Sequence, residues 1–210
     1  MSQGVFITFE GVEGCGKTTQ VRMLTEWLRA SGHDVVVTRE PGGTPIAEAI
    51  RELLLDPANK AFAPTAELLM YAAARAQHVA ELIRPALAAG KIVICDRFAD
   101  STTAYQGAGR GLKPETVAAL HSIATDGVWP HLTIVVDVPA EVGLSRAKGR
   151  NIPLNRLEQE SLTFHQRVRA AFLALAEAEP ERVKRVDGLG TPEQVHEAVA
   201  LLARDVLEMP

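Results

Sequence analysis

A phosphate-binding loop is encoded by residues 9–19, which read FEGVEGCGKTT. Gly11, Gly16, Lys17 and Thr18 satisfy the pattern G-x-x-x-x-G-K-[ST], after an apolar run and at the start of a stretch with helical spacing. The glycines let backbone N–H groups face an anion, and the start of the helix adds positive potential. Lys17 can reach outer phosphates and the Thr18 hydroxyl can bind Mg²⁺. The loop therefore predicts nucleotide binding.

A second group of polar residues follows the third apolar run, in the stretch CDRFADSTTAYQGAGRG at 95–111. In an open parallel sheet, ligands bind beyond the carboxyl ends of the strands, so Asp96 and Arg97 are expected beside the phosphate loop. The forked guanidinium of Arg97 suits an acceptor phosphate, and the Asp96 carboxylate suits the water shell of a magnesium ion. Together with the loop, this stretch predicts a two-substrate phosphoryl-transfer site.

A phosphate loop alone fits a kinase, a hydrolytic NTPase, a GTP switch or an ATP-driven binding module. A GTP switch normally carries an NKxD motif, and the one NK pair here, at 59–60, is followed by AF. A partition or binding ATPase needs no second phosphate clamp. The motifs favour a kinase, with kinases for another nucleoside monophosphate or for a deoxynucleoside as the nearest rivals.

Five short apolar runs predict the strands that must position these residues: 5–10, 34–39, 91–97, 131–138 and 182–188. They alternate with stretches of helical spacing, and several are continuous β-branched runs. Both features favour a parallel sheet covered by helices on its two faces, an α/β fold. Gly32, Gly90 and the capping sequence TPEQ at 191–194 mark helix ends. The long stretch 64–90 reads as one helix.

The composition is that of a globular protein, with 47% hydrophobic and 23% charged residues in 210. The length predicts a single domain over 1–210. A net charge of −4 makes nucleic acid or an anionic membrane surface an improbable partner, which favours small-molecule substrates. Cys15 and Cys95 lack disulfide or zinc spacing. Because no leader or membrane-spanning run is seen, the expected location is the cytoplasm.

A basic, polar excursion interrupts the helical patterns at 145–156, with the sequence SRAKGRNIPLNR. Gly149 and Pro153 break it, and it carries four basic residues. This composition predicts a mobile lid.

Four separated motifs together resemble the bacterial thymidylate kinases, of the P-loop nucleoside monophosphate kinase superfamily. They are FEGVEGCGKTT, TREPGGT at 38–44, DRFADSTTAYQG at 96–107 and NRLEQES at 155–161. The resemblance implies a P-loop kinase fold with a five-stranded parallel sheet and a short basic lid. It also implies transfer of the γ-phosphate of ATP to dTMP, giving dTDP and ADP, with Mg²⁺ as cofactor, in an enzyme that is usually a homodimer.

Carried over by position, the resemblance implies a role for each motif residue. Arg97 would grip the dTMP phosphate, Tyr71 would stack on thymine with Arg75 bonding its O4, and Tyr105 would exclude a ribose 2′-hydroxyl. The catalytic set is Lys17, Arg97, Arg150, Glu13 and Asp96, and the metal set is Thr18 with Asp96 acting through water. The ATP set is Gly11, Gly14, Cys15, Gly16, Lys17, Thr18, Thr19 and Arg146. The dTMP set is Glu13, Arg39, Pro41, Arg51, Tyr71, Arg75, Arg97, Ser101, Thr102, Tyr105 and Gln106.

The lid must supply a catalytic cation, because some thymidylate kinases carry an arginine in the loop where this chain has Gly14. An arginine that arrives on closure can stabilise the charge that develops in phosphoryl transfer. We expect Arg150, beside Gly149, to reach the phosphates, with Arg146 second. Arg156 is expected to anchor the lid through a pair with Glu158.

Overall fold

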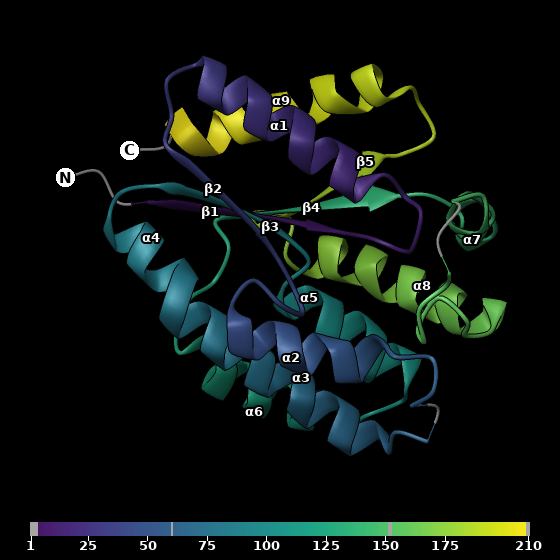
Figure 1. Cartoon of the computed structure of the whole chain (residues 1–210). Helices are drawn as coiled ribbons and strands as arrows, with labels where there is room; N and C mark the ends of the chain where they lie inside the picture. The colour runs from purple at the N-terminus through teal and green to yellow at the C-terminus, as the bar shows by residue number, and fades with distance from the viewer. Residues whose placement is uncertain (1–3, 60, 151–152, 209–210) are drawn as a thin grey trace.

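A parallel sheet forms the centre of the computed structural model, which describes residues 4–59, 61–150 and 153–208. Its five strands lie in the order β2-β3-β1-β4-β5 (Figure 1), and every neighbouring pair is parallel. The sequence predicted all of them to within a residue at each end. The strands are β1 (Val5–Glu10), β2 (Val35–Arg39), β3 (Ile92–Asp96), β4 (Leu132–Asp137) and β5 (Val183–Asp187).

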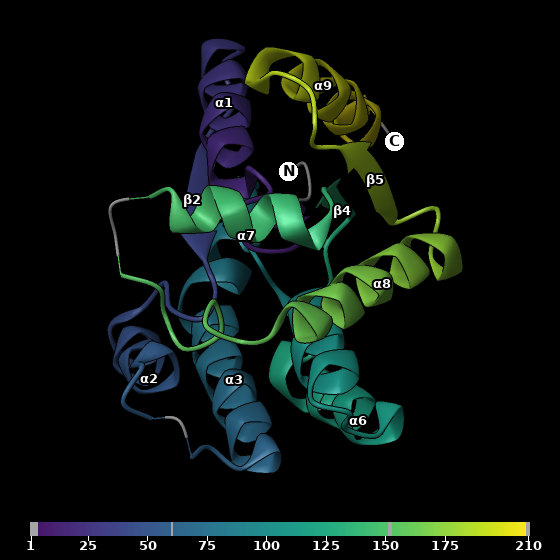
Figure 2. The same ribbon diagram turned by 90° about the vertical axis from the view of Figure 1, so that its right-hand side faces the viewer.

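Helices cover both faces of this sheet, as the continuous apolar runs predict. Helices α1 (Lys17–Ala30) and α9 (Pro192–Glu208) lie on one face in Figure 1, and the other helices apart from α7 lie on the opposite side. Figure 2 shows α7 (Ala140–Lys148) crossing the end of the sheet, above the loop that leads to α8 (Leu162–Ala178). The remaining helices are α2 (Pro45–Leu55), α3 (Pro64–His78), α4 (Arg84–Ala88), α5 (Ala99–Thr102) and α6 (Pro114–Thr125).

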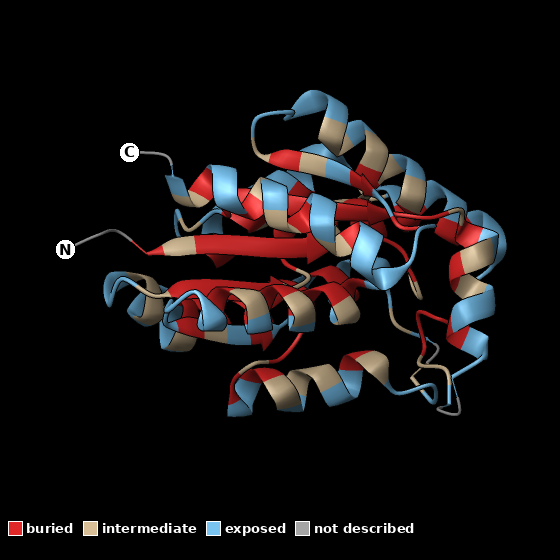
Figure 3. Ribbon diagram, turned by 90° about the horizontal axis from the view of Figure 1, so that it is seen from above, coloured by how far each residue is buried: buried red, intermediate tan, exposed pale blue. Residues whose placement is uncertain are grey.

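The strands form the core, and β4 is buried along its whole length (Figure 3). Buried side chains of β1, β4 and α1 belong to one apolar cluster with Phe164, Val168 and Phe172 of α8. None of the helices described for this chain has the length and apolarity that a membrane crossing needs. Both cysteines are buried and free.

The predicted continuous helix over 64–90 is interrupted by a wider π turn, η1 (Val79–Ile83), between α3 and α4. This turn comes directly before Arg84 and Pro85. A proline has no N–H to give the carbonyl four residues back, and its ring crowds that carbonyl, so the hydrogen-bond pattern changes there. A second π segment, η2 (Thr103–Gly109), follows α5. The sequence reading did not predict it.

The basic excursion expected over 145–156 begins later than predicted, because Ser145–Lys148 form the last turn of α7. Residues 151–152 of the predicted lid lie outside the described residues. From residue 153 the chain runs through turns to α8, whose cap is the Ser161 hydroxyl accepting from Phe164 N. The term lid is used below for residues 145–158, which include the last turn of α7.

Candidate active site

The phosphate loop connects β1 to α1 and presents its lysine inward. Gly16 takes a left-handed backbone conformation just before α1, which only glycine adopts readily. Lys17 Nζ donates to the carbonyl oxygens of Gly11 and Val12, at 3.1 and 2.9 Å, and lies 3.4 Å from Cys15 Sγ. The loop thus holds the ammonium group against its own backbone, beside the N-terminus of the helix.

Thr18 and Asp96 meet at the ends of α1 and β3. The Thr18 hydroxyl donates to Asp96 Oδ2 at 2.8 Å. The register explains the meeting, because Asp96 pairs with Phe9 of β1, just before the loop begins. This is the pairing of hydroxyl and carboxylate oxygens that the sequence proposed for a metal.

Arg97 lies directly after β3 in a left-handed conformation, with φ of 73°, which is uncommon for a residue with a side chain. Its Nη1 donates to Gly11 O and Ser101 Oγ, at 3.0 and 3.1 Å. Its Nη2 donates to Glu13 Oε1 and Tyr105 Oη, at 2.9 and 3.0 Å. Arg97 therefore ties β3 to the phosphate loop and to η2 at once.

Glu13 carries the negative charge of this corner. Burial raises the pKa of its carboxyl, but Arg97 and Lys17 outweigh burial and lower that pKa to about 2. The Tyr105 hydroxyl donates to the same carboxylate at 3.0 Å. Those neighbours keep Glu13 ionised at neutral pH, between two cations.

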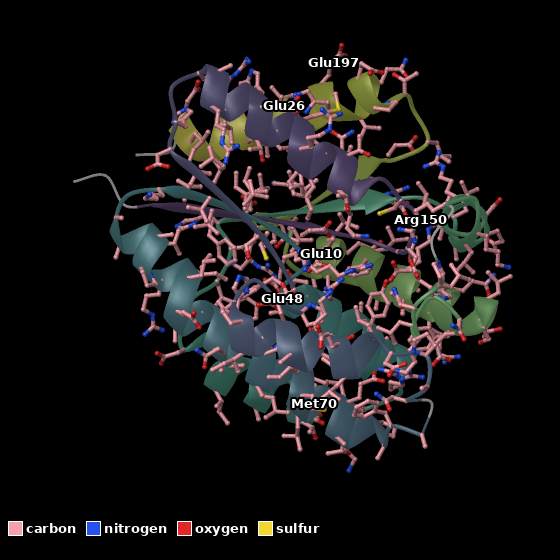
Figure 4. All side chains as sticks on the ribbon, viewed as in Figure 1. Glu10, Glu26, Glu48, Met70, Arg150 and Glu197 are labelled. Carbon is pink, nitrogen blue, oxygen red and sulfur yellow. The ribbon has the colours of Figure 1, made fainter. Side chains whose placement is uncertain are left out.

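Glu10 is a buried acid that the sequence reading missed. At the end of β1 it accepts hydrogen bonds from Phe98 N at 2.7 Å, from Ser101 N at 3.2 Å and from Ser101 Oγ at 2.5 Å. Figure 4 shows it between the sheet and the helices of the lower layer. Burial raises the pKa of Glu10 to about 7, against the opposing influence of Arg97. These hydrogen bonds hold the segment from Phe98 to Ser101 against the end of β1.

A cavity of about 520 Å³ opens above these groups. All eleven residues of the predicted dTMP set line it. Six residues of the predicted ATP set also line it: Gly14, Gly16, Lys17, Thr18, Thr19 and Arg146. Asp96 and Arg150 also line it. Gly11 and Cys15 do not, since both are buried beneath the loop. The motifs are scattered over the sequence from residue 13 to residue 150, and the fold brings them to one hollow.

Tyr71 and Arg75 lie on one face of α3 and line the deep side of the cavity, as their spacing predicted. Arg75 is 2% exposed; its Nε donates to Glu40 Oε2 at 2.8 Å, and its Nη2 donates to Phe98 O and Thr102 Oγ1 at 3.0 Å each. Glu40 also bonds His78 Nδ1, at 3.0 Å. The sequence reading passed over Glu40, although it lies inside the REPGG motif.

Two arginines hold the rim of the acceptor side. Arg39 Nη2 donates to Glu48 Oε2 at 2.9 Å, and Arg51 Nη1 donates to Pro41 O at 2.6 Å. Burial lowers the pKa of Arg51, and the nearby charge of Arg39 adds to that effect. Arg39 and Arg51 line the same cavity as Arg97.

The lid contacts differ from the predicted ones. Arg150 pairs with Glu158, whose other oxygen accepts from Asn155 N at 2.9 Å. Arg156 instead pairs with Glu67 of α3 at 2.6 Å, and its Nε donates to Leu54 O at 2.8 Å. The expected Arg156–Glu158 pair was therefore wrong. Arg156 contacts α2 and α3 and anchors the end of the lid there, while Glu158 pairs with Arg150.

Arg146, in the last turn of α7, and Arg150, just after that helix, both line the cavity. Figure 4 shows Arg150 near α7 at the open end of the sheet. Arg146 Nη1 donates to Gly188 O at 3.2 Å.

Gly14 and Gly143 form the contact between the phosphate loop and α7. A Cβ built on Gly14 would overlap the carbonyl oxygen of Gly143, and a Cβ on Gly143 would overlap the carbonyl oxygen of Glu13. Gly14 also has a φ of 67°. No side chain fits at position 14 while α7 stays in place.

The described residues contain no group of three or more His, Cys, Asp or Glu placed to hold a metal ion. Thr18 and Asp96 nevertheless supply oxygen groups at the cavity wall, 2.8 Å apart. Magnesium in nucleotide sites takes one or two protein oxygens and completes its octahedron with phosphate oxygens and water. The residues present fit that kind of site.

Comparisons with known proteins give matches over nearly the whole chain. The family model described as thymidylate kinase matches residues 9–199. A thymidylate kinase of Geotalea uraniireducens (strain Rf4) is 56% identical over 208 residues, covering 96% of this chain and 98% of its own. A thymidylate kinase of Thermomicrobium roseum is 53% identical over 203 residues, covering 97% and 96%. The crystal structure of thymidylate kinase from Ehrlichia chaffeensis is 36% identical, covers 96% of this chain and 99% of its own, and has a TM-score of 0.78.

Proposed function

Because the chain belongs to the thymidylate kinase family and transfers the γ-phosphate of ATP to dTMP, giving dTDP and ADP, we propose that the cavity beside the phosphate loop binds both nucleotides. The observation that carries this assignment is the face-to-face placement of two phosphate-binding elements. Lys17 and Thr18 of the phosphate loop line the same cavity as Arg97, which follows β3. In-line transfer needs donor and acceptor phosphates side by side, and this arrangement supplies a cation to each.

On the donor side, the loop backbone and Lys17 bind the outer phosphates of ATP. Among the described residues, Lys17 Nζ bonds two backbone carbonyls and the Cys15 sulfur, so phosphate oxygens can take over as its partners without breaking an ion pair. Charge spreads over the transferring oxygens during the reaction, and a fixed ammonium group is most useful at that moment. Lys17 is thus assigned to the transition state.

On the acceptor side, Arg97 and Arg51 face the dTMP phosphate and Tyr71 faces the base. Arg97 Nε–H has no partner among the described residues, while its other donors fix the guanidinium to Glu13, Tyr105, Ser101 and Gly11. Its charge is held in place before substrate arrives. Tyr105 lies 3% exposed beneath the same region, which suits its proposed role against a 2′-hydroxyl.

Mg²⁺ is the proposed cofactor, with Thr18 as a direct oxygen ligand and Asp96 orienting water. When bound, a magnesium ion offsets negative charge on the phosphate oxygens that it touches. Asp96 accepts the Thr18 hydroxyl hydrogen bond and so holds that oxygen in position. The lid supplies the last cation, for which Arg150 is the leading candidate and Arg146 the second.

The proposal includes a homodimer in the cytoplasm, where its charged substrates are retained. Leu53 of α2, Leu69 of α3 and Ile123 of α6 are exposed apolar side chains on neighbouring helices. Exposed apolar side chains gathered on one layer are typical of an interface. Ile123→Glu should lower the molar mass measured by light scattering from twice to once that of the chain.

The function is tested by ADP release with different acceptors. Purified protein with ATP and Mg²⁺ is given dTMP, dUMP, dCMP, AMP or water alone. We expect fast release with dTMP and a rate near background with water. Lys17→Ala should fold normally and lower kcat by orders of magnitude. Release that is equally fast without any monophosphate would defeat the assignment.

A further inference from the structure

Glu67 is a fully buried carboxylate at the junction of α3, η2 and the lid. It accepts a hydrogen bond from Gln106 Nε2 at 2.7 Å and two from Arg110, at 3.2 Å each, and it pairs with Arg156 Nη1 at 2.6 Å. Burial raises its pKa, but hydrogen bonds from Arg110 and Gln106 outweigh burial and lower it. Glu67 is therefore ionised at neutral pH and can only accept hydrogen bonds.

This state of Glu67 dictates the orientation of the Gln106 amide. Because a carboxylate cannot donate, the atom 2.7 Å from Glu67 Oε1 must be the amide nitrogen of Gln106. The amide oxygen then points away from Glu67. It accepts no hydrogen bond from the part of the chain that the structure describes, yet it is not among the enclosed polar atoms without a partner. Since Gln106 lines the cavity, that oxygen faces it.

Arg75 offers the opposite kind of group to the same cavity. Its Nε and Nη2 are taken by Glu40, Phe98 and Thr102, and its Nη1 has no partner within the described residues. Arg75 and Glu67 lie two helical turns apart on α3, with Tyr71 between them. The wall beside Tyr71 thus presents one donor, from Arg75, and one acceptor, from Gln106.

We propose that Glu67 is a positioning residue for base choice, holding the Gln106 amide so that its oxygen accepts the N3–H of the acceptor pyrimidine. This inference rests on the proposed function, in which Tyr71 and Arg75 receive the base. Thymine shows N3–H and O4, a donor beside an acceptor, which complements Gln106 Oε1 and Arg75. Cytosine shows an unprotonated N3 and an amino group, so both contacts become mismatches.

Glu67 also stabilises Arg110 and Arg156, so loss of its charge could loosen the pocket generally. Two controls separate the possibilities. Arg110 has a second carboxylate partner, Glu160, at 2.6 Å, which makes no contact with Gln106 in the described structure. Glu160→Gln therefore disturbs the same arginine and spares the amide. The second control is dUMP, because uracil has the same N3–H and O4 as thymine and lacks only the methyl group.

The test measures kcat/KM for dTMP, dUMP and dCMP in the wild type, Glu67→Gln and Glu160→Gln. A glutamine at 67 can donate or accept, so the Gln106 amide is free to turn over. In Glu67→Gln we expect the preference for dTMP over dCMP to fall by at least about tenfold, and the ratio of dTMP to dUMP to stay within about twofold. Glu160→Gln should leave both ratios unchanged.

A double-mutant cycle covers the case in which Glu67→Gln folds poorly. Gln106→Met keeps the length of the side chain and removes the amide, so it should lower the dTMP over dCMP ratio by a similar factor. Adding Glu67→Gln to Gln106→Met should then change that ratio no further. In the wild type, the Gln106 side-chain NH₂ signal, assigned by its loss in Gln106→Met, should exchange slowly with and without dTMP.

Several results would overturn the inference while leaving the kinase function intact. They are an unchanged dTMP over dCMP ratio in folded Glu67→Gln, an equal loss in Glu160→Gln, or parallel changes of the dUMP and dCMP ratios. An NH₂ signal that is protected only when dTMP is bound would also overturn it, because the nitrogen would then face the substrate. If dTMP did not raise the rate of ADP release by the wild type, the kinase function itself would be contradicted.

Discussion

Arg97 Nη2 donates to Glu13 Oε1 at 2.9 Å, which joins the end of β3 to the phosphate loop by an ion pair with both side chains only 16% exposed. The elements proposed to bind the donor and the acceptor are thereby held at a fixed separation before either nucleotide binds. In a reaction governed by positioning and charge, such a link belongs to the machinery and not only to the fold.

Arg97→Lys tests whether the forked shape of the Arg97 guanidinium matters as well as its positive charge. Lysine keeps the positive charge but cannot make the bonds that Arg97 makes to four partners. We expect kcat/KM for dTMP to fall by at least about a hundredfold. Arg167→Lys, whose arginine bonds Gly109 O away from the cavity, should stay near the wild type. Near-normal activity of Arg97→Lys would show that charge alone is enough.

Arg150→Ala should lower kcat by at least about a hundredfold and change KM for dTMP little, because its contact with the phosphates forms chiefly in the closed transition state. Steady-state kinetics of Ala variants at 146 and 150 check this. A collapse of kcat at 146 alone would transfer the role to Arg146. If neither variant loses more than a few-fold, the catalytic cation lies outside the lid.

Arg156→Ala should act on stability and not on the chemistry. Arg156 and Glu67 are almost fully enclosed, and removal of one partner leaves a buried carboxylate with less compensation. We expect a loss of about 3 kcal/mol in the free energy of unfolding, measured by urea denaturation. Arg22→Ala, which breaks an exposed pair with Glu26, should cost less than about 1 kcal/mol. Equal losses of unfolding free energy in Arg156→Ala and Arg22→Ala would mean that the buried pair of Arg156 contributes no more than an exposed pair.

Tyr105→Phe is informative because the structure gives its hydroxyl two partners. From the sequence alone, Tyr105→Phe is expected to change the choice of dTMP over its ribonucleotide little. The hydroxyl donates to Glu13 and accepts from Arg97, at 3.0 Å each, so its loss leaves buried polar groups short of a partner. We now expect a cost of about 1–3 kcal/mol in the free energy of unfolding. Urea denaturation within about 0.5 kcal/mol of the wild type would contradict it.

Glu10→Gln should alter the pH dependence of stability. Burial raises the pKa of Glu10 from 4.5 to about 7, so between these values the folded chain holds a proton that the unfolded chain releases. The contribution of Glu10 is complete below pH 4.5 and is lost as pH rises through 7. A glutamine resembles the protonated acid and removes this loss, which is about 3 kcal/mol.

Urea denaturation of both proteins at pH 4.5 and pH 8 measures that difference, and these limits bracket the two pKa values. The free energy of unfolding of the wild type, relative to Glu10→Gln, should decrease from the lower pH to the higher. Glu26→Gln, at an exposed carboxyl, should follow the wild type. Parallel curves for the wild type and Glu10→Gln would mean that Glu10 is ionised in the folded state at pH 5.

The sequence predicted the sheet well because each strand is a short apolar run and the runs are buried on both faces. Local spacing also found the cap of α9, where Gln194 N donates to Thr191 Oγ1 at 3.3 Å and Gln194 Oε1 accepts from Thr191 N at 2.9 Å. Neither π segment was predicted, because a wider turn keeps the apolar spacing of a helix. Pro85 was the available signal for the first of them.

The site was predicted as far as motifs extend, and no further. The motif residues converge on one cavity, but the acids that orient them were missed. Glu10 and Glu40 lie inside recognised motifs, but their roles depend on partners 88 and 35 residues away. The pairing of Arg156 was predicted from proximity in sequence, with Glu158, and the chain instead folds it against Glu67. Local spacing cannot choose between near and distant carboxylates.

The interlock of Gly14 with Gly143 has an evolutionary consequence. Thymidylate kinases with an arginine in the loop and those with basic lids look like variants separated by one residue. On this backbone they are not, because a side chain at position 14 would displace α7, and α7 carries Arg146 and leads into Arg150. Gly14→Arg would add one cation to the loop but displace the helix that carries Arg146 and leads into Arg150. In this chain, a change from lid cations to a loop arginine would therefore require α7 to move as well as residue 14 to change.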